Sequence, residues 1–198
     1  MNSTRSHPQL HDGGLLRASI LFAVIILLGM GLLYSLAGTA LGRSLFPHQA
    51  TGSIVLQDGK PVGSSLVAQA FSDAIYFQPR PSAAGYDPMA AAGSNQARTN
   101  PDLRKRIAET TAEVSAREGI AAQDVPAELV TQSGSGLDPH ISPAGARVQI
   151  ARVAQARGLD PSVVAALVAA NTQAPQFGVL GQPRVNVLQL NLALDAAR

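Results

Sequence analysis

The chain has no cysteine and no tryptophan, and it has only four histidines. Without cysteine it can form no disulfide framework, no thiolate metal site and no cysteine nucleophile. His7 and His11 lie near the N-terminus, His48 follows a long apolar run, and His140 stands alone in the C-terminal half. A histidine-based metal cluster cannot be built from such a distribution. We therefore expect no metal ion.

The common motifs of catalysis and nucleotide binding are also missing. Neither G-x-x-x-x-G-K-[ST] nor G-x-G-x-x-G occurs, which excludes the usual phosphate-binding loops. The stretch Gly134-Ser135-Gly136 departs from G-x-S-x-G because position 133 is serine. A triad of Ser135, Asp138 and His140 would have to converge from one short stretch, whereas such triads draw on distant segments. These residues therefore disfavour a hydrolase.

Charged residues are few, and they are unevenly divided. Three of the 15 Lys and Arg and one of the 13 Asp and Glu precede Pro47, which leaves twelve of each sign in the remainder. A neutral domain with few aromatic side chains offers no electrostatic footprint for nucleic acid. We therefore expect no nucleic-acid partner.

One long apolar run is present. No charged side chain occurs from Ala18 to Leu41, and Arg17 and Arg43 flank the run. A helix of about 20 apolar residues is long enough to cross a bilayer. We interpret residues 15–42 as a transmembrane helix that contacts membrane lipid.

The segments around this helix complete the expected organisation. Residues 1–14 are expected to form a flexible polar tail, residues 43–52 a juxtamembrane linker, and residues 53–198 a soluble domain. The alternative is a cleaved signal peptide, because Gly38-Thr39-Ala40 offers small residues to a peptidase. The length of the run and the polar tail before it favour an uncleaved anchor.

Small residues recur along the expected transmembrane helix. Gly31, Ser35, Gly38 and Gly42 follow one another at spacings of four, three and four. Such spacing places them on one stripe, where a second helix can approach closely. Glycine is common in membrane helices in general, so an incidental pattern is the alternative. We expect this stripe to pack against a membrane partner.

The flanking charges give a weak indication of orientation. Arg5, Arg17 and the α-amino group precede the apolar run, and Arg43 and Lys60 follow it. The positive-inside rule therefore favours a cytoplasmic N-terminus by a small margin. The soluble domain would then lie outside the cytoplasm.

The soluble domain begins with a hairpin pattern. Asp58-Gly59 separates two apolar stretches and predicts strands near 53–56 and 61–67. Residues 76–101 are rich in Pro, Gly, Ala and Ser without a steady period, so we expect a long ordered loop. Loops of this length in compact domains are often functional, which makes it a candidate contact surface.

Helices follow, each opened by a capping side chain and a proline. The pairs are Asn100-Pro101, Ser142-Pro143 and Asp160-Pro161, and Gly119 and Gly158 end the first two helices. The second helix is expected to present a polar face: Arg147, Gln149, Arg152 and Arg157. The last segment, 185–197, fits a strand or a buried helix, and its alanine-rich end favours the helix. The fold class is a small α+β domain, strands first and helices later.

The stretch TQSGSGLDPHIS at 131–142 concentrates hydroxyls and glycines. Backbone N–H groups from Ser133 to Gly136, with the helix that Ser142 opens, would be able to hold an anion. The alternative is a local turn in which Asp138 and Ser142 act as caps and the glycines supply positive φ. The residues alone favour the turn.

Six stretches of the sequence stand out together: YFQPRPSA at 76–83, GSN at 93–95, TNP at 99–101, LVTQSGSGLDPHISP at 129–143, QIARVAQARG at 149–158 and LGQPRVNVLQLNLALD at 180–195. In this order they resemble one family, the C subunit of the Kdp potassium-transporting P-type ATPase complex (the KdpC family). The resemblance runs from the membrane span to the C-terminus. Ala68 and residues 96–98 depart from the family pattern.

The resemblance implies an accessory subunit rather than an enzyme. Its partners would be a channel-like K⁺-translocating subunit and the P-type subunit that hydrolyses ATP. The resemblance further implies that the chain would be needed for assembly and stability of a high-affinity potassium uptake system, and that it would act as a catalytic chaperone that raises the ATP affinity of the hydrolysing subunit. The location implied is the bacterial inner membrane, with a single span.

ATP is the one small ligand that the resemblance implies. Gln149 would contact the nucleotide, with Ser133 and Ser135 from the adjacent loop; the alternative for Gln149 is an exposed residue near a helix start. Direct contact would require the domain in the cytosol, whereas the charge bias places it outside, from where it would act only through coupling across the membrane. Two other functions remain as alternatives: a stalked extracytoplasmic hydrolase and a membrane-anchored binding module unrelated to potassium.

Overall fold

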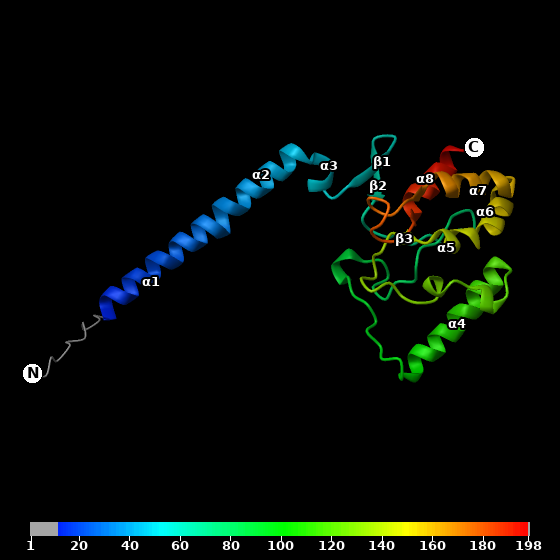
Figure 1. Ribbon diagram of the computed structural model, residues 1–198, viewed down its shortest axis with the longest axis horizontal. Coiled ribbons are helices and arrows are strands. Elements are labelled where there is room, and N and C mark those ends of the chain that lie inside the picture. The colour runs from blue at the N-terminus through cyan, green and yellow to red at the C-terminus, as the bar shows by residue number, and fades with distance from the viewer. Residues whose placement is uncertain (1–11, 198) are drawn as a thin grey trace, which may run out of the picture. The chain divides into compact units, whose positions relative to one another are not determined.

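The computed structural model describes residues 12–197, so most of the expected tail, residues 1–11, lies outside the described residues. The chain divides into two compact units, Met1–Gly52 and Ser53–Arg198. Figure 1 labels their helices and strands.

The first unit is dominated by one long helix. It comprises α1 (Asp12–Ile26), a π-helical stretch η1 (Leu27–Tyr34) and α2 (Ser35–Leu45). Within it, Gly14–Leu45 contains an 18-residue stretch with a mean hydropathy of 2.5 and is the one helix of the described chain that is long and apolar enough to cross a membrane. A helix of this length and composition suits a single membrane span.

The helix is longer than the 15–42 expected from charge. It already includes residues 12–14 of the expected tail and continues into the expected linker as far as Leu45. No proline occurs from Asp12 to Phe46, and Phe46 leaves the helical region with φ −135° and ψ 60°. Pro47 then opens the short helix α3 (Pro47–Ala50), so most of the linker is helical.

The second unit begins with the expected hairpin. Strands β1 (Ile54–Gln57) and β2 (Lys60–Ser64) pair antiparallel. Asp58 and Gly59 both have positive φ, 52° and 75°. A two-residue turn with two positive φ angles matches the right-handed twist of the strands, which is why Asp-Gly predicts it. The second strand ends at Ser64, three residues before the end expected at residue 67. The chain from Ser65 to Asn100 has no regular element except the short 3₁₀ helix η2 (Pro88–Ala90), and it includes nearly all of the long loop expected at 76–101.

Five helices of the second unit carry most of its regular structure. They are α4 (Pro101–Glu118), α5 (Pro143–Arg147), α6 (Ile150–Arg157), α7 (Pro161–Ala170) and α8 (Val187–Ala196), with the short 3₁₀ helices η3 (Ala122–Asp124) and η4 (Ala127–Leu129) before α5. The expected caps form: Asn100, Ser142 and Asp160 each accept a hydrogen bond from a backbone N–H of the first turn. Gly119 and Gly158 end α4 and α6 in the left-handed region.

The expected continuous helix from Pro143 to Arg157 is wrong in one respect. It is broken at Val148 and Gln149, so α5 and α6 are separate helices. At the break the N–H of Gln149 donates to Ala146 O, a three-residue spacing. This tighter, 3₁₀-type spacing interrupts the α-helical hydrogen bonding between α5 and α6.

The order of strands first and helices later is also wrong. A second antiparallel sheet has the order β3-β5-β4, built from β3 (His140–Ile141), β4 (Thr172–Gln173) and β5 (Arg184–Asn186). These strands lie between the helices in the sequence. The α+β class itself is confirmed.

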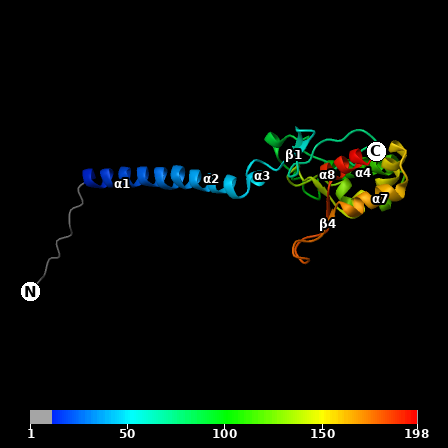
Figure 2. The same cartoon turned by 90° about the horizontal axis from the view of Figure 1, so that it is seen from above.

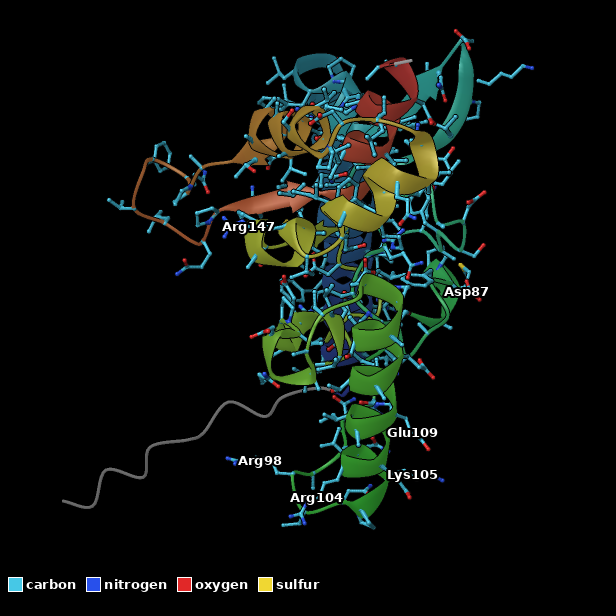
Figure 3. All side chains as sticks on the ribbon, turned by 90° about the vertical axis from the view of Figure 1, so that its right-hand side faces the viewer. Asp87, Arg98, Arg104, Lys105, Glu109 and Arg147 are labelled. Atoms are coloured by element: carbon cyan, nitrogen blue, oxygen red, sulfur yellow. The ribbon has the colours of Figure 1, made fainter. Side chains whose placement is uncertain are left out.

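The core of the domain lies between the second sheet and the helices. Helices α6, α7 and α8 lie close together (Figure 1), with α7 in contact with both of the others. Their buried side chains meet those of the sheet and of α4; the core residues are Phe77, Val114, Leu129, Ile141, Ala146, Val153, Ala154, Val164, Val168, Val185, Val187, Leu190 and Leu194. The first turns of α4 are polar, and Figure 3 shows Arg104, Lys105 and Glu109 pointing away from the domain.

Candidate functional site

The irregular segment 74–78 is held to the domain by side chains instead of a sheet. Phe77 N donates to Asn191 Oδ1 (2.9 Å), and Asn191 Nδ2 donates to Phe77 O (2.9 Å). Gln78 N donates to Gln149 Oε1 (2.8 Å), and Gln149 Nε2 donates to Gln78 O (3.1 Å). Each amide side chain therefore pairs with both backbone groups of one residue. We call Asn191 and Gln149 the amide clamp.

The position of Gln149 explains its part in the clamp. Ala146, Gln149 and Val153 are all 0% exposed, and their spacings of three and four place them on one helical face. Gln149 Nε2 also donates to Gly145 O (3.1 Å), and its Oε1 also accepts from Arg152 (2.9 Å). An amide has two donors and two acceptor lone pairs, so its capacity is fully used. The expected exposed position on the polar face is wrong.

A buried carboxylate extends this network. Arg152 Nη1 donates to Ala74 O (2.6 Å) and Tyr76 O (3.0 Å), and its Nε donates to Glu118 Oε2 (2.9 Å). Glu118, whose side chain is 0% exposed, also accepts from Arg117 Nε (2.6 Å). A buried charge is tolerated when it is paired and hydrogen-bonded in this way. Arg152 thereby links the end of α4 to segment 74–78.

Arg157 holds the same segment from the neighbouring turn of α6. Its Nε donates to Ile75 O (2.7 Å), and its Nη2 pairs with Asp195 of α8 (2.8 Å). Its guanidinium lies 5.1 Å from the centre of the Tyr76 ring, whose hydroxyl donates to Asp195 (3.2 Å). The planar guanidinium of arginine can stack on an aromatic face and donate forked hydrogen bonds at the same time, which the ammonium of lysine cannot do. Segment 74–78 is therefore fastened to both α6 and α8.

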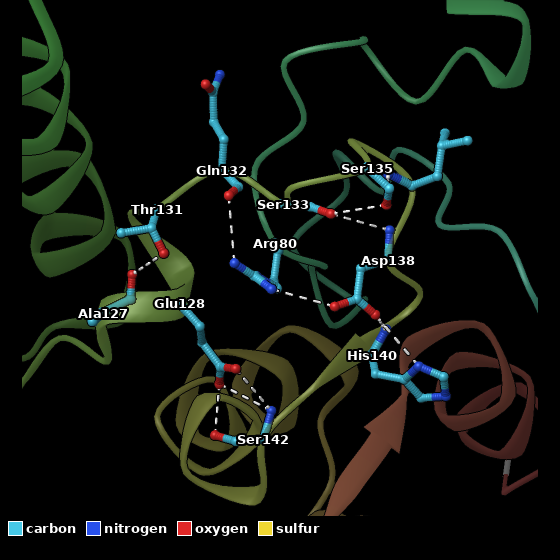
Figure 4. Close-up of polar contacts among 11 residues, drawn as sticks. Arg80, Ala127, Glu128, Thr131, Gln132, Ser133, Ser135, Asp138, His140 and Ser142 are labelled. Carbon is cyan, nitrogen blue, oxygen red and sulfur yellow. Dashed lines mark hydrogen bonds and ion pairs between the residues drawn. The ribbon is translucent and has the colours of Figure 1, made fainter. Parts of the chain in front are cut away.

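The serine-rich loop uses its polar groups within itself (Figure 4). Ser133 is 2% exposed; its N–H donates to Pro81 O (3.0 Å), and its hydroxyl shares a hydrogen bond with that of Ser135 (3.2 Å). Gly136 N donates to Ser133 O (3.1 Å), and Leu137 N donates to the Ser135 hydroxyl (3.1 Å). The N–H groups of Ser133, Gly136 and Leu137 are therefore engaged in hydrogen bonds within the domain and are not free for an anion. The geometry matches the turn.

Asp138 stabilises the end of this loop. It pairs with Arg80 Nη1 (3.3 Å), and it accepts from His140 N (3.0 Å) with His140 Nδ1 at 3.4 Å (Figure 4). The hydrogen bond from His140 is the main cause that holds the pKa of Asp138 below its ordinary value, with Arg80 adding to it and partial burial opposing it. Because Ser135 bonds Ser133 and Leu137, it does not supply a nucleophile to this pair.

Glu128 and Ser142 form the start of α5, next to the loop. Ser142 donates to the Glu128 carboxylate from its N–H (2.9 Å) and its hydroxyl (2.6 Å), and Gly145 N donates to the Ser142 hydroxyl (3.0 Å). A Cβ at Gly145 would overlap the Glu128 carboxylate. A cleft of about 400 Å³ opens beside this cap, lined by Arg80, Glu128, Asp138, His140, Ile141, Ser142, Gln182, Pro183 and Arg184. Across residues 12–197, no three His, Asp or Glu side chains gather where they would hold a metal ion.

The four small residues of the expected packing stripe lie on the long helix. Gly31 is in η1, and Ser35, Gly38 and Gly42 are in α2. A Cβ added at Gly31, Gly38 or Gly42 would have no atom within 4 Å. This face is open to a second helix, and its role in helix packing stays a prediction.

The contacts described above join residues from three of the stretches that resemble the KdpC family, namely 76–83, 149–158 and 180–195. Comparison with known proteins decides whether the chain belongs to this family. The model of the KdpC family, "K+-transporting ATPase, c chain", matches residues 16–196. The chain belongs to the KdpC family. The "Potassium-transporting ATPase KdpC subunit" of Xanthomonas oryzae pv. oryzae (strain MAFF 311018) is 66% identical over 188 residues, 95% of this chain and 90% of the relative. That of Shewanella putrefaciens (strain CN-32 / ATCC BAA-453) is 52% identical over 180 residues, 91% of this chain and 88% of the relative.

Membership in the KdpC family confirms the expected assignment: the chain is a subunit of a potassium-transporting ATPase. The clamp gives these family stretches a physical role. Phe77 and Gln78 belong to 76–83, Gln149 to 149–158, and Asn191 to 180–195. Three of the six stretches that resemble the family thus bind one another in the fold.

Sequence reasoning missed Asn191, Glu118 and the backbone contacts of Arg152 and Arg157. One signal was present for Gln149: it lies three residues after Ala146 and four before Val153, both apolar, so it shares their face. A polar residue on an apolar face indicates a buried hydrogen-bonding role.

Proposed function

We propose that the chain is a membrane-anchored, non-catalytic accessory subunit of its potassium-transporting ATPase, needed for assembly and stability of the complex. One observation carries the proposal: the side chains capable of chemistry serve to hold the domain together. The Gln149 amide clamps Gln78, the Ser133 and Ser135 hydroxyls close their own loop, and His140 contacts Asp138. A domain with such an interior acts through its surface, by contact with partner proteins.

The anchor supports the same proposal. The long helix fits a single span of a bacterial inner membrane, and its open glycine face suits close packing with a membrane helix of another subunit. The partners proposed are the channel-like K⁺-translocating subunit and the P-type subunit that hydrolyses ATP. Membrane lipid would surround the remaining apolar faces.

An effect on ATP affinity is proposed to act at a distance. Gln149, which would have to meet the nucleotide, is 0% exposed and has its hydrogen-bonding capacity filled. Direct contact would require the bonds to Gln78 to open first. We therefore favour a domain outside the cytoplasm that stabilises the state of the hydrolysing subunit with high ATP affinity, a coupling of typically about 1–3 kcal/mol.

Two measurements test this proposal. The first is sidedness: because the chain has no cysteine, Ala50→Cys and Lys60→Cys provide unique thiols. Both should react with a membrane-impermeant maleimide in intact spheroplasts. The second is the ATP dependence of hydrolysis by the purified complex, with and without the chain; its removal should raise the KM for ATP roughly 5- to 150-fold. Thiols that react only after lysis would place the domain in the cytosol and reopen direct contact.

A further inference from the structure

The loop between β4 and β5 projects from the body of the domain as a small apolar hairpin. Figure 2 shows it extending from β4 away from the helices, and Figure 3 shows the same projection from the side. At its tip Phe177 is 84% exposed, Val179 79% and Leu180 57%. From Ala174 to Pro183 there is no charged residue. We call residues 174–183 the apolar hairpin.

The hairpin is a defined structure and not a loose loop. Gln176 N donates to Leu180 O (2.8 Å), Leu180 N donates to Gln176 O (2.9 Å), and Val179 N donates to Gln176 O (3.2 Å). Phe177 and Gly178, the two central residues of the turn, have φ of 54° and 78°. Glycine adopts this region freely, whereas a bulky residue there is strained.

Inside the described domain, nothing compensates for the strained backbone conformation of Phe177. Tyr86 also has positive φ, 63°, but its hydroxyl donates to Arg80 O (3.0 Å) and its N–H donates to the Ser82 hydroxyl (3.0 Å). Phe177 instead places its ring in solvent. Backbone strain at an exposed aromatic tip is a feature of binding sites, where the strain holds a side chain ready for its partner.

The charge and family of the chain identify the kind of partner. A loop that binds a membrane surface combines apolar residues with several basic ones, and here only Arg184 follows the hairpin. The KdpC family consists of subunits, so a protein partner exists. Aromatic anchors in apolar pockets dominate protein interfaces.

We infer that the apolar hairpin docks its tip, with Phe177 as the anchor, in a neutral apolar pocket of another subunit of the same ATPase. This inference rests on the proposed function and adds to it the contact by which the domain outside the bilayer holds the complex together.

A crosslinking experiment tests the partner. The full-length chain, with a benzophenone amino acid at position 177 and separately at Val163, an exposed position on α7, is irradiated in native membranes. We expect an adduct with another subunit at position 177 and none at 163. Adducts of position 177 with lipid alone, or equal protein adducts at both positions, would overturn the inference.

A pair of substitutions tests the energetics in the tagged full-length chain. Phe177→Asp should weaken capture of the other subunits at least roughly 30-fold, the equivalent of a strong interface anchor. Val163→Asp, in the first turn of α7 where an acidic residue is tolerated, should leave capture unchanged. Capture of all subunits by Phe177→Asp at the wild-type level would refute the docking contact.

Phe177→Gly separates docking from folding. Glycine relieves the positive φ, so the thermal midpoint of the full-length chain should stay equal or rise, while capture falls as with Phe177→Asp. A lower midpoint would assign Phe177 a structural role and overturn the inference. If the wild-type chain captures no other subunit, both the proposed function and this inference fail. If only the Phe177 variants lose capture, the proposed function stands and the loss is assigned to the hairpin.

Discussion

Replacement of Gln149 tests whether this residue is a structural clamp. In Gln149→Met the side chain keeps nearly the same length but loses its four hydrogen bonds. The N–H and C=O of Gln78 lose their partners, and each unpaired group costs about 1–3 kcal/mol when buried. Gln78 is half-buried, so water recovers part of this cost. We expect a loss of about 2–4 kcal/mol in the free energy of unfolding.

The assay is thermal unfolding of the full-length chain in detergent, followed by circular dichroism and by hydrogen exchange of a peptide covering 74–80. For a domain of this size the loss corresponds to a fall of about 5–12 °C in the midpoint. Gln155→Met is the matched control, since Gln155 is an exposed glutamine on the same helix α6, and it should change stability by less than about 0.5 kcal/mol.

Hydrogen exchange sharpens this prediction. The amides of Phe77 and Gln78 donate to clamp side chains, so their exchange should accelerate in Gln149→Met and stay slow in the control. Equal midpoints and equal exchange in the variant and the wild type would refute the clamp and favour a ligand-binding role for Gln149.

Three further predictions concern neighbouring contacts. Gly145→Ala should push the Glu128 carboxylate away from the cap of α5 and cost about 1–2 kcal/mol, measured by denaturant unfolding. Arg157→Lys should cost about 1–3 kcal/mol in the same assay, because one ammonium cannot replace the bonds to Ile75 O, Leu194 O and Asp195. The pKa of Asp138 is lowered on folding, so its stabilisation is present above its ordinary value of about 3.8 and is lost as pH falls through the lower folded pKa. Asp138→Asn should therefore be less stable than wild type at pH 7, by less than about 1 kcal/mol given its partial exposure, and the two should converge in strong acid.

Each of these has a contrary outcome. Unchanged unfolding of Gly145→Ala would mean that the carboxylate has room to move. If Arg157→Lys were as stable as the wild type, the hydrogen bonds from Arg157 to Ile75 O and Leu194 O would contribute no net free energy to folding. If Asp138→Asn and the wild type differed in unfolding free energy by the same amount from neutral to acid pH, the charge of Asp138 would not be the cause of the stabilisation.

Much of the helical structure was predictable because its signals are local. Asn100, Ser142 and Asp160 stand before prolines, and both the capping oxygen and the fixed φ of proline act within one turn. Gly119 and Gly158 end helices for a similarly local reason, the left-handed conformation. The apolar run predicted its helix through composition alone.

The second sheet and the clamp were not predictable by the same means. Strands β3, β4 and β5 have two or three residues, too few for an alternating pattern to emerge. The clamp joins residues 71 and 114 positions apart, and no local pattern pairs an amide side chain with a distant backbone. Glu118 ends a polar helix, and its burial depends on Arg152 in another helix. Only the packed domain brings these groups together.

The most direct test of the account is purification of the tagged full-length chain from its native membrane in a mild detergent. The account predicts that a P-type subunit and a K⁺-translocating subunit accompany it, and that the preparation hydrolyses ATP in a K⁺-dependent way that the chain alone does not. A chain recovered by itself from the aqueous fraction, or one that hydrolyses ATP unaided, would contradict it.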